Sequence, residues 1–118
     1  MWIEEDRVEL WKTTLLPQFL DETASRLVDL EIERSILQEG GCAIIAAQKI
    51  CAIAHKISGT AETFGFPDLG RQASATEALC RTLLNPAPTC ISTAEKENLL
   101  AAVEYLIYHL DQTLCTPF

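Results

Sequence analysis

The stretch CAIIAAQKICAIAHKISGTAETFGFP, residues 42–67, decides the fold that this sequence predicts. Its apolar side chains recur at three- and four-residue steps, which is the period of an amphipathic helix. On a helical wheel, the stripe that faces the core consists of Ile50, Ile53, Ile57, Ala61 and Phe64. Gly65 can take the left-handed conformation that ends a helix, and Pro67 can start the next helix. The stretch therefore predicts one long helix over residues 42–64, followed by a sharp turn.

The chain before this stretch also has a helical pattern, interrupted at two places. A short helix is expected over residues 3–15, ending near Pro17, because an inner proline removes a helical hydrogen bond. Pro17 suits the first turn of a second helix over residues 17–38. The Glu-Gly-Gly sequence at 39–41 is typical of a helix end. We expect the short helix to cap the front of the longer ones.

The chain after the stretch predicts two further helices. One covers residues 67–84 and ends at a loop with two prolines, residues 85–89. The last begins at Ser92, which forms the capping-box pattern S-x-x-E with Glu95. Strands are not expected because no segment alternates with a period of two. We predict a single all-α domain over 1–118, an antiparallel four-helix bundle (up-down-up-down) with a short extra N-terminal helix.

The balance of charge argues against nucleic acid and anionic membranes as partners. The 118 residues include 17 Asp and Glu against 9 Lys and Arg, a formal net charge of −8. An acidic surface without a basic patch disfavours nucleic acid and anionic membranes. The N-terminus lacks a signal-peptide pattern, and the most apolar stretch, CAIIAA at 42–47, is too short to span a bilayer. We expect a free-standing cytoplasmic domain that binds no nucleic acid and no membrane.

The five cysteines predict buried thiols and no metal site. Four of them stand among small or apolar neighbours, as reduced cysteines in a core do. None forms a C-x-x-C pair, and zinc sites need ligands at short spacing. The odd number and the absence of pairs favour a reducing compartment.

His55 is expected to point away from the core. On the helical wheel it lies opposite the isoleucine stripe. The residues on its own side are polar or small; they are Gln48, Cys51, Ala52, Ser58, Gly59 and Glu62. His109, the other histidine, is crowded by Tyr105 and Tyr108 and is interpreted as structural or incidental.

Gly59 is the most informative neighbour of His55. A glycine inside a helix costs about 1 kcal/mol relative to alanine, so a helix keeps one where something must come close to the backbone. Two interpretations remain open at this point: Gly59 clears the approach of a partner to His55, or it lets a neighbouring helix pack closely. An exposed histidine is also compatible with an ordinary polar surface position.

The residues around His55 resemble the motif of histidine-containing phosphotransfer (Hpt) domains, the four-helix-bundle modules of phosphorelays. That motif is approximately H-x-[LI]-K-G with two small residues, then an apolar residue and glycine. The matching positions here are His55, Ile57, Gly59, Thr60, Ala61, Phe64 and Gly65. Leu69 and the upstream FLDETASRLVDL, residues 19–30, are also similar to the family. The resemblance covers the whole chain in architecture and is specific over residues 54–69.

One position departs from the family pattern. The family usually has lysine three residues after the histidine, where this chain has Ser58. Lys56 stands about 100° round the helix, and Lys49 lies two turns back. The departure implies weaker electrostatic support for a phosphoryl group, and it leaves open whether Lys56 compensates.

The resemblance implies that His55 is a phosphorylated nucleophile. Its imidazole would accept a phosphoryl group from, and return it to, the aspartate of a response-regulator receiver domain, with that domain or a hybrid histidine kinase as partner. Lys56, Ser58, Gly59 and Glu62 would surround the phosphoryl site. The chain would bind no cofactor, and Mg²⁺ is expected on the receiver. Without a nucleotide-binding loop the chain is expected to be a phosphocarrier and not an enzyme. A monomer is expected because nothing in the sequence specifies a dimer.

The expected docking surface surrounds His55. Its candidate residues are Ile44, Gln48, Cys51, Ala52, Arg71 and Gln72. Each also fits an ordinary surface position, and Ile44 also fits the core. A bundle that regulates a receiver or kinase by docking alone, without carrying phosphate, remains the alternative function. A metal-binding bundle is set aside because neither histidine has a glutamate three residues before it: position 52 is alanine and position 106 is leucine.

Overall fold

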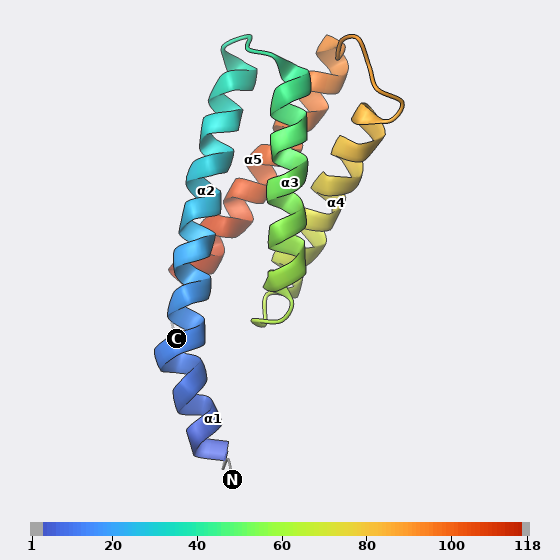
Figure 1. Cartoon of the computed structure of the whole chain (residues 1–118). Coiled ribbons are helices and arrows are strands. Elements are labelled where there is room, and N and C mark those ends of the chain that lie inside the picture. The colour runs from blue at the N-terminus through green and yellow to red at the C-terminus, as the bar shows by residue number, and fades with distance from the viewer. Residues whose placement is uncertain (1–3, 117–118) are drawn as a thin grey trace.

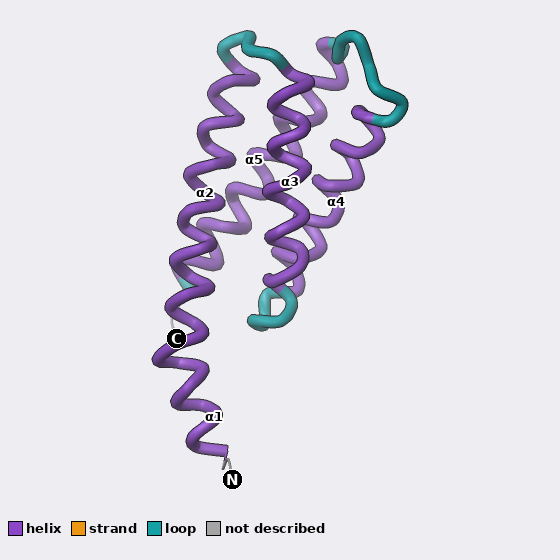
Figure 2. Tube along the Cα trace, viewed as in Figure 1, coloured by secondary structure: helices purple, strands orange, loops and turns teal. Residues whose placement is uncertain are grey.

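Four long antiparallel helices form the bundle in the computed structural model, which describes residues 4–116 (Figure 1). The elements are α1 (Glu4–Leu10), the π-helix η1 (Trp11–Leu15), α2 (Leu16–Gln38), α3 (Ala43–Ala61), α4 (Pro67–Leu84) and α5 (Thr93–Cys115). Short loops join the long helices, and residues 4–116 contain no strand (Figure 2). The predicted all-α class and four-helix architecture are confirmed.

The helices pack in a ring, each against its neighbours in the chain. α3 packs most closely against α4, and α5 closes the ring by packing against α2. The buried core is aliphatic and runs along the bundle axis; its largest members include Leu30, Leu37, Ile50, Leu99, Leu106 and Leu110. No helix within residues 4–116 is long and apolar enough to cross a membrane.

The short N-terminal helix is present, as predicted, but it continues into the bundle without a break instead of capping its front. α1, η1 and α2 follow one another directly over residues 4–38, and within the described part of the chain the backbone of α1 makes no close contact with a helix of the bundle (Figure 1). The backbone N–H of Leu16 donates to the carbonyl of Trp11, five residues back. This wide turn stands directly before Pro17, which lacks an N–H, and lets the helical path continue past it.

The turn between α3 and α4 begins earlier than predicted. α3 ends at Ala61 instead of Phe64, and Gly65 has a φ of 87°, the left-handed conformation expected of it. The N–H of Phe66 donates back to the carbonyl of Ala61 over 2.9 Å, which closes the helix end. The rings of Phe64 and Phe66 stack on Phe19 of α2, with centroids 4.5 and 5.6 Å away. These contacts hold the end of α3 against α2.

The capping box at the start of α5 is confirmed. The Ser92 hydroxyl accepts the N–H of Glu95 over 3.1 Å, and the Glu95 carboxylate accepts the N–H of Ser92 over 3.0 Å. The bond from the Ser92 N–H to the carboxylate is the largest cause that lowers the pKa of Glu95. Two of the unpaired N–H groups at the helix start thereby gain acceptors.

The prediction of four buried cysteines is wrong. Only Cys80 is buried, and burial raises the pKa of its thiol to about 12. Cys51 is half-buried, whereas Cys42, Cys90 and Cys115 are exposed. The exposed three lie at a helix start, in a loop and at a helix end, where small or apolar neighbours in the sequence do not surround the side chain in space.

Candidate functional site

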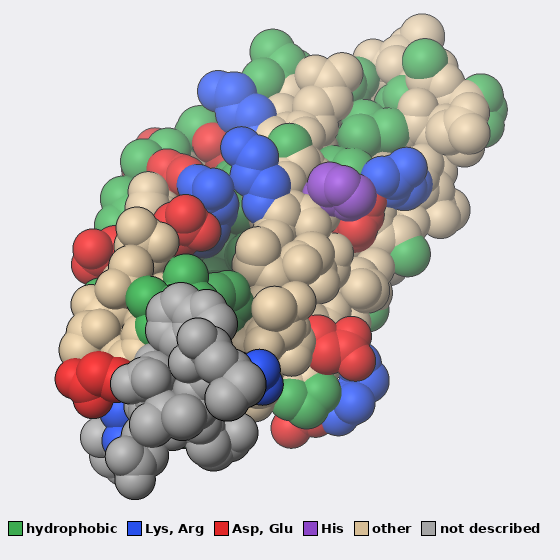
Figure 3. All heavy atoms as spheres, turned by 60° about the horizontal axis from the view of Figure 1, so that its bottom comes forward, with side chains coloured by type: hydrophobic (Ala, Val, Ile, Leu, Met, Phe, Trp, Pro, Cys, Tyr) green, Lys and Arg blue, Asp and Glu red, His purple; other side chains and the backbone are tan. Residues whose placement is uncertain are grey.

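His55 stands on the outer surface of α3. Its side chain is 68% exposed, while Ile50 and Ile57 of the same helix are buried in the core. The helical period therefore places the imidazole opposite the isoleucine stripe, as predicted. Figure 3 shows a histidine on the surface of the bundle, with basic side chains on both sides of it and an acidic side chain below.

Glu77 of α4 binds the imidazole. Its Oε2 lies 2.9 Å from His55 Nδ1, and the glutamate side chain is only 13% exposed. A carboxylate can only accept hydrogen bonds, so Nδ1 must carry the proton in this contact. In the neutral imidazole, the other nitrogen, Nε2, then keeps a free lone pair. The contact therefore leaves Nε2 as the ring nitrogen that can accept a bond.

Arg81, one turn further along α4, binds the same carboxylate oxygen. Its Nε donates to Glu77 Oε2 over 3.0 Å, and its Nη2 donates to the same atom. The hydrogen bond from Arg81 is the largest cause that lowers the pKa of Glu77, and the bond from His55 adds to it against the opposing effect of burial. Glu77 is thus held as a carboxylate that faces two donors from two helices.

Sequence analysis missed both Glu77 and Arg81. Their four-residue spacing is the usual signal of an ion pair along one helix face. That signal does not say which residue of α3 the pair meets, because the register between α3 and α4 is a tertiary property. The pairing with His55 appears only when the two helices are packed together.

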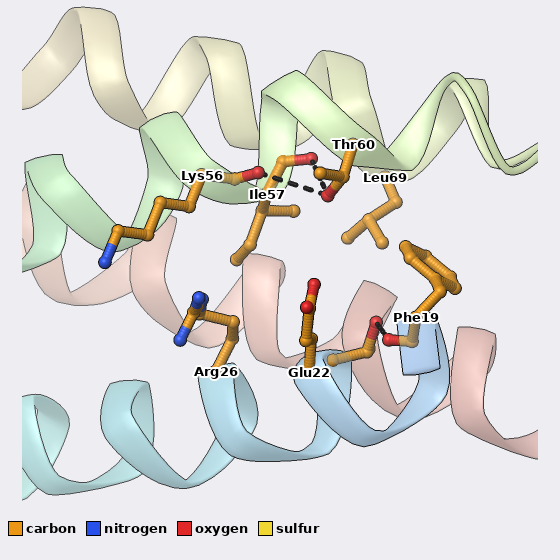
Figure 4. Close-up of a pocket in the computed structure, with 8 residues that line it drawn as sticks. Phe19, Glu22, Arg26, Lys56, Ile57, Thr60 and Leu69 are labelled. Atoms are coloured by element: carbon orange, nitrogen blue, oxygen red, sulfur yellow. Dashed lines mark hydrogen bonds between the residues drawn. The ribbon is translucent and has the colours of Figure 1, made fainter. Parts of the chain in front are cut away.

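The residues next to His55 divide between the two flanks of α3. Ser58 lies on the α4 flank, where its hydroxyl donates to the backbone carbonyl of His55 over 3.0 Å. Lys56 lies on the α2 flank and lines a pocket with Glu22 and Arg26 of α2 (Figure 4). Across that pocket, the ends of Lys56 and Arg26 extend in the same direction (Figure 4). The charge of Lys56 is therefore directed along the α2 groove.

Gly59 is exposed and has open space where a side chain would stand. Apart from its chain neighbours and the nearby backbone of its own helix, a Cβ built on it meets no atom of the described residues within 4 Å. The interpretation that Gly59 allows a neighbouring helix to pack closely is therefore excluded within residues 4–116. The remaining interpretation is clearance on the outside of the molecule, one turn from His55.

Several of the other predicted surface residues gather near His55. Gln48 and Ala52 are exposed along the same line of α3, and Cys51 is half-buried towards α4. Glu62 and Arg71 line a hollow with Ser58 between α3 and α4. Arg71 also forms an ion pair with Asp68.

The structure does not bring Ile44 and Gln72 into this group. Ile44 is on the same side of α3 as His55 but about 16 Å away along the helix, where it lines a hollow with Cys90 and Ile91. Gln72 is half-buried and lies roughly 160° round α4 from Ser74, which faces the hollow beside Ser58. Neither residue lies next to the His55 imidazole.

The second histidine has a different environment. His109 is half-buried, and its ring meets Tyr105 and Tyr108 edge-on, with centroids 4.8 and 5.7 Å away. The crowding expected from the sequence is present. Among residues 4–116, no group of three or more His, Cys, Asp or Glu side chains could hold a metal ion.

The fold and the site define a helical module that carries one histidine on an exposed face. The family model described as Hpt domain matches residues 14–113 of this chain. The chain belongs to the Hpt domain family, whose members carry phosphoryl groups in two-component phosphorelays. The comparison found no kinase or ATP-binding domain. No curated protein and no solved structure matched the chain.

Proposed function

We propose that His55 is the residue that carries the phosphoryl group, accepting it from and returning it to the aspartate of a receiver domain. The observation that carries this proposal is the contact between His55 Nδ1 and Glu77, which in the neutral imidazole leaves Nε2 with a free lone pair on an exposed face. The motif around His55 and the family match supply the context. The partner is a response-regulator receiver, free or attached to a hybrid histidine kinase.

The geometry gives a simple chemical step. The lone pair of Nε2 attacks the phosphorus of the receiver's aspartyl phosphate, the bond between phosphorus and the aspartate oxygen breaks, and the carboxylate leaves. The imidazole then holds phosphorus on Nε2 and its original proton on Nδ1. Glu77 balances the positive charge that develops on the ring. No proton has to leave the site, so the reverse reaction uses the same atoms.

The remaining electrostatic support comes from the receiver. Mg²⁺ is expected there, beside the aspartyl phosphate, and this chain is expected to bind no cofactor. This chain supplies the nucleophile and its orientation. One exposed face is sufficient for such a reaction, so we expect the chain to act as a monomer.

The docking face is proposed to centre on Gly59. Gln48, Cys51 and Ala52 extend it along α3, and Arg71 extends it onto α4. Open space at Gly59 supports this assignment because no side chain there obstructs the approach to the imidazole. Ile44 and Gln72 belong to it only if the partner reaches well beyond His55.

A label-transfer experiment tests the proposal. The chain is incubated with a receiver carrying ³²P on its aspartate, and the label is followed into acid-labile, base-stable phosphohistidine. His55→Gln should lose the label, while the matched variant His109→Gln should keep it. Equal labelling of the wild type and His55→Gln would contradict the assignment.

The alternative function is regulation by docking alone. Ser58 favours it, because the position that usually supplies a lysine carries no charge here. In that case a panel of phosphorylated receivers would bind the chain but leave no label on the wild type. Equal affinity of the wild type and His55→Gln for a receiver, together with no label on either, would decide for docking.

A further inference from the structure

The phosphoryl site has no cation at the position the family motif provides. Ser58 stands there, and its hydroxyl is already used in a bond to the carbonyl of His55. Lys56 is one residue from the histidine but lines the groove towards α2 (Figure 4). A transferred phosphoryl group carries close to two negative charges at neutral pH. The residues of α3 alone therefore neutralise the charge of the phosphoryl group poorly.

Arg81 is connected to His55 through a single atom. Glu77 Oε2 accepts from His55 Nδ1 over 2.9 Å and from Arg81 Nε over 3.0 Å. The guanidinium and the imidazole are therefore at most two hydrogen-bond lengths apart. α3 packs more closely against α4 than any other pair of helices does, so the core holds the two backbones that carry these side chains next to each other.

The guanidinium also has donors to spare. It carries five N–H groups, and its contacts with Glu77 use the Nε and Nη2 nitrogens. Its side chain is 64% exposed, so donors that Glu77 does not use are open to solvent, and Cys51 beside it is a further partner of the guanidinium. A planar guanidinium can bind two phosphoryl oxygens at once, which an ammonium on a flexible stem does less specifically.

We propose that Arg81 binds the phosphoryl group on His55 and does the work of the lysine that Ser58 replaces. This inference rests on the proposed function of His55. In the free protein, Glu77 holds Arg81 beside the imidazole. After transfer, the phosphoryl oxygens carry more negative charge than the carboxylate and draw the guanidinium from Glu77, which keeps the Nδ1 proton. Glu77 therefore keeps the Arg81 guanidinium next to His55 until the phosphoryl group is transferred.

The experiment begins with a small phosphoryl donor. Phosphoramidate phosphorylates exposed histidine without a receiver, so the chain alone can be loaded and its ³¹P resonance followed against pH. A bound cation favours the more highly charged form of the phosphoryl group, so Arg81→Gln should raise the pKa of that group by about half a unit to one unit. Arg7→Gln removes an equal charge from α1 and should leave the titration unchanged.

Kinetics with a phosphorylated receiver give a second measure. Arg81→Gln should lower the rate of transfer about tenfold, in line with the loss of a charge-assisted hydrogen bond at a partly exposed site. Adding Ser58→Lys to Arg81→Gln should restore most of the rate, because it places a cation where the family has one. Circular dichroism of each variant checks that the bundle is intact.

A double-variant cycle separates direct contact from positioning. If Arg81 acted only by holding Glu77, its removal would have no effect once Glu77→Gln had broken that pair. Direct contact predicts that Arg81→Gln still slows transfer in the Glu77→Gln background. An unchanged phosphoryl titration in Arg81→Gln overturns the inference while leaving His55 phosphorylated. Absence of any phospho-His55 in the wild type overturns the proposed function itself.

Discussion

The two histidines of this chain show how surroundings decide what an imidazole can do. His55 lies on the open face of α3, bound through Nδ1 to a carboxylate and followed by an exposed glycine. His109 lies on α5, half-buried and held edge-on by two tyrosine rings. The first ring has a fixed tautomer and an exposed Nε2, whereas the second is half-buried against two aromatic rings. The difference lies in the neighbours that other residues and another helix supply.

The strongest test of this comparison is a competition between the two rings for phosphoramidate. The wild type should take up one phosphoryl group, on His55, because His109 is half-buried and its neighbours among residues 4–116 are aromatic rings where His55 has a bound carboxylate. Intact-protein mass spectrometry counts the groups, and peptide mapping at high pH places them. Comparable modification of His109 would show that the surroundings described for His55 confer no advantage.

The next largest effect should come from removing the carboxylate. Glu77→Gln should slow transfer from a phosphorylated receiver about ten- to a hundredfold, since an amide can donate to Nδ1 as well as accept and no longer fixes the tautomer. The rate constant at saturating receiver should fall while the receiver concentration for half-maximal rate stays the same. A change confined to that concentration would indicate a docking role for Glu77 instead.

The same variant predicts a pH dependence of stability. The pKa of Glu77 is lowered in the folded protein from an ordinary value of 4.5, chiefly by the hydrogen bond from Arg81. Its stabilising contribution is therefore fully present above pH 4.5 and is lost as the pH falls through the folded-state pKa. The wild type should exceed Glu77→Gln in free energy of unfolding at pH 7, and the two should converge in acid. Urea unfolding at several pH values measures this difference.

A smaller effect is expected at Gly59. Gly59→Ala should raise the free energy of unfolding by up to about 1 kcal/mol, because alanine is the better helix former and its Cβ meets nothing. Gly59→Leu should fold as well but slow transfer from a receiver severalfold, since its side chain stands where the partner approaches. Both variants should still react with phosphoramidate, which is small enough to pass. Equal transfer rates for the wild type and Gly59→Leu would place the docking face elsewhere.

The smallest effect on the site should come from the helix that carries His109. Ser92→Ala removes one half of the capping box of α5 and should lower the free energy of unfolding by about 1 kcal/mol. Phosphorylation of His55 should be unchanged, because α3 and α4 hold that site. A measurable loss of transfer at a temperature where the variant is fully folded would mean that α5 contributes to the site.

The sequence predicted those features that local signals determine. The turn at Gly65 and the capping box at Ser92 follow from residues within a few positions of each other, and the outward direction of His55 follows from the helical period. The break at Pro17 was predicted wrongly because a wide helical turn before a proline leaves no mark in the hydrophobic pattern. Local rules predict that a helix ends before such a proline, whereas in this chain a π-helical turn lets the helix continue.

The features that the sequence did not predict depend on packing between helices. Glu77 and Arg81 meet His55 only through the register of α4 against α3, which no single segment encodes. Arg71 faces the hollow beside Ser58 and Gln72 does not, although the two are adjacent in the sequence, because one step turns a helix by about 100°. The exposed cysteines were predicted wrongly for a related reason: neighbours along the chain are not the neighbours that cover a side chain in space.

The continuous rod of α1, η1 and α2 has a consequence for hydrogen exchange. α1 touches only η1 within residues 4–116, so opening its turns breaks no contact with the core. Amide protons of α1 should exchange through local fraying, whereas those around Ile50 in α3 should exchange only when the whole bundle unfolds. One uninterrupted helical path therefore spans two levels of protection, and the boundary between them should fall near the π-helical turn before Pro17.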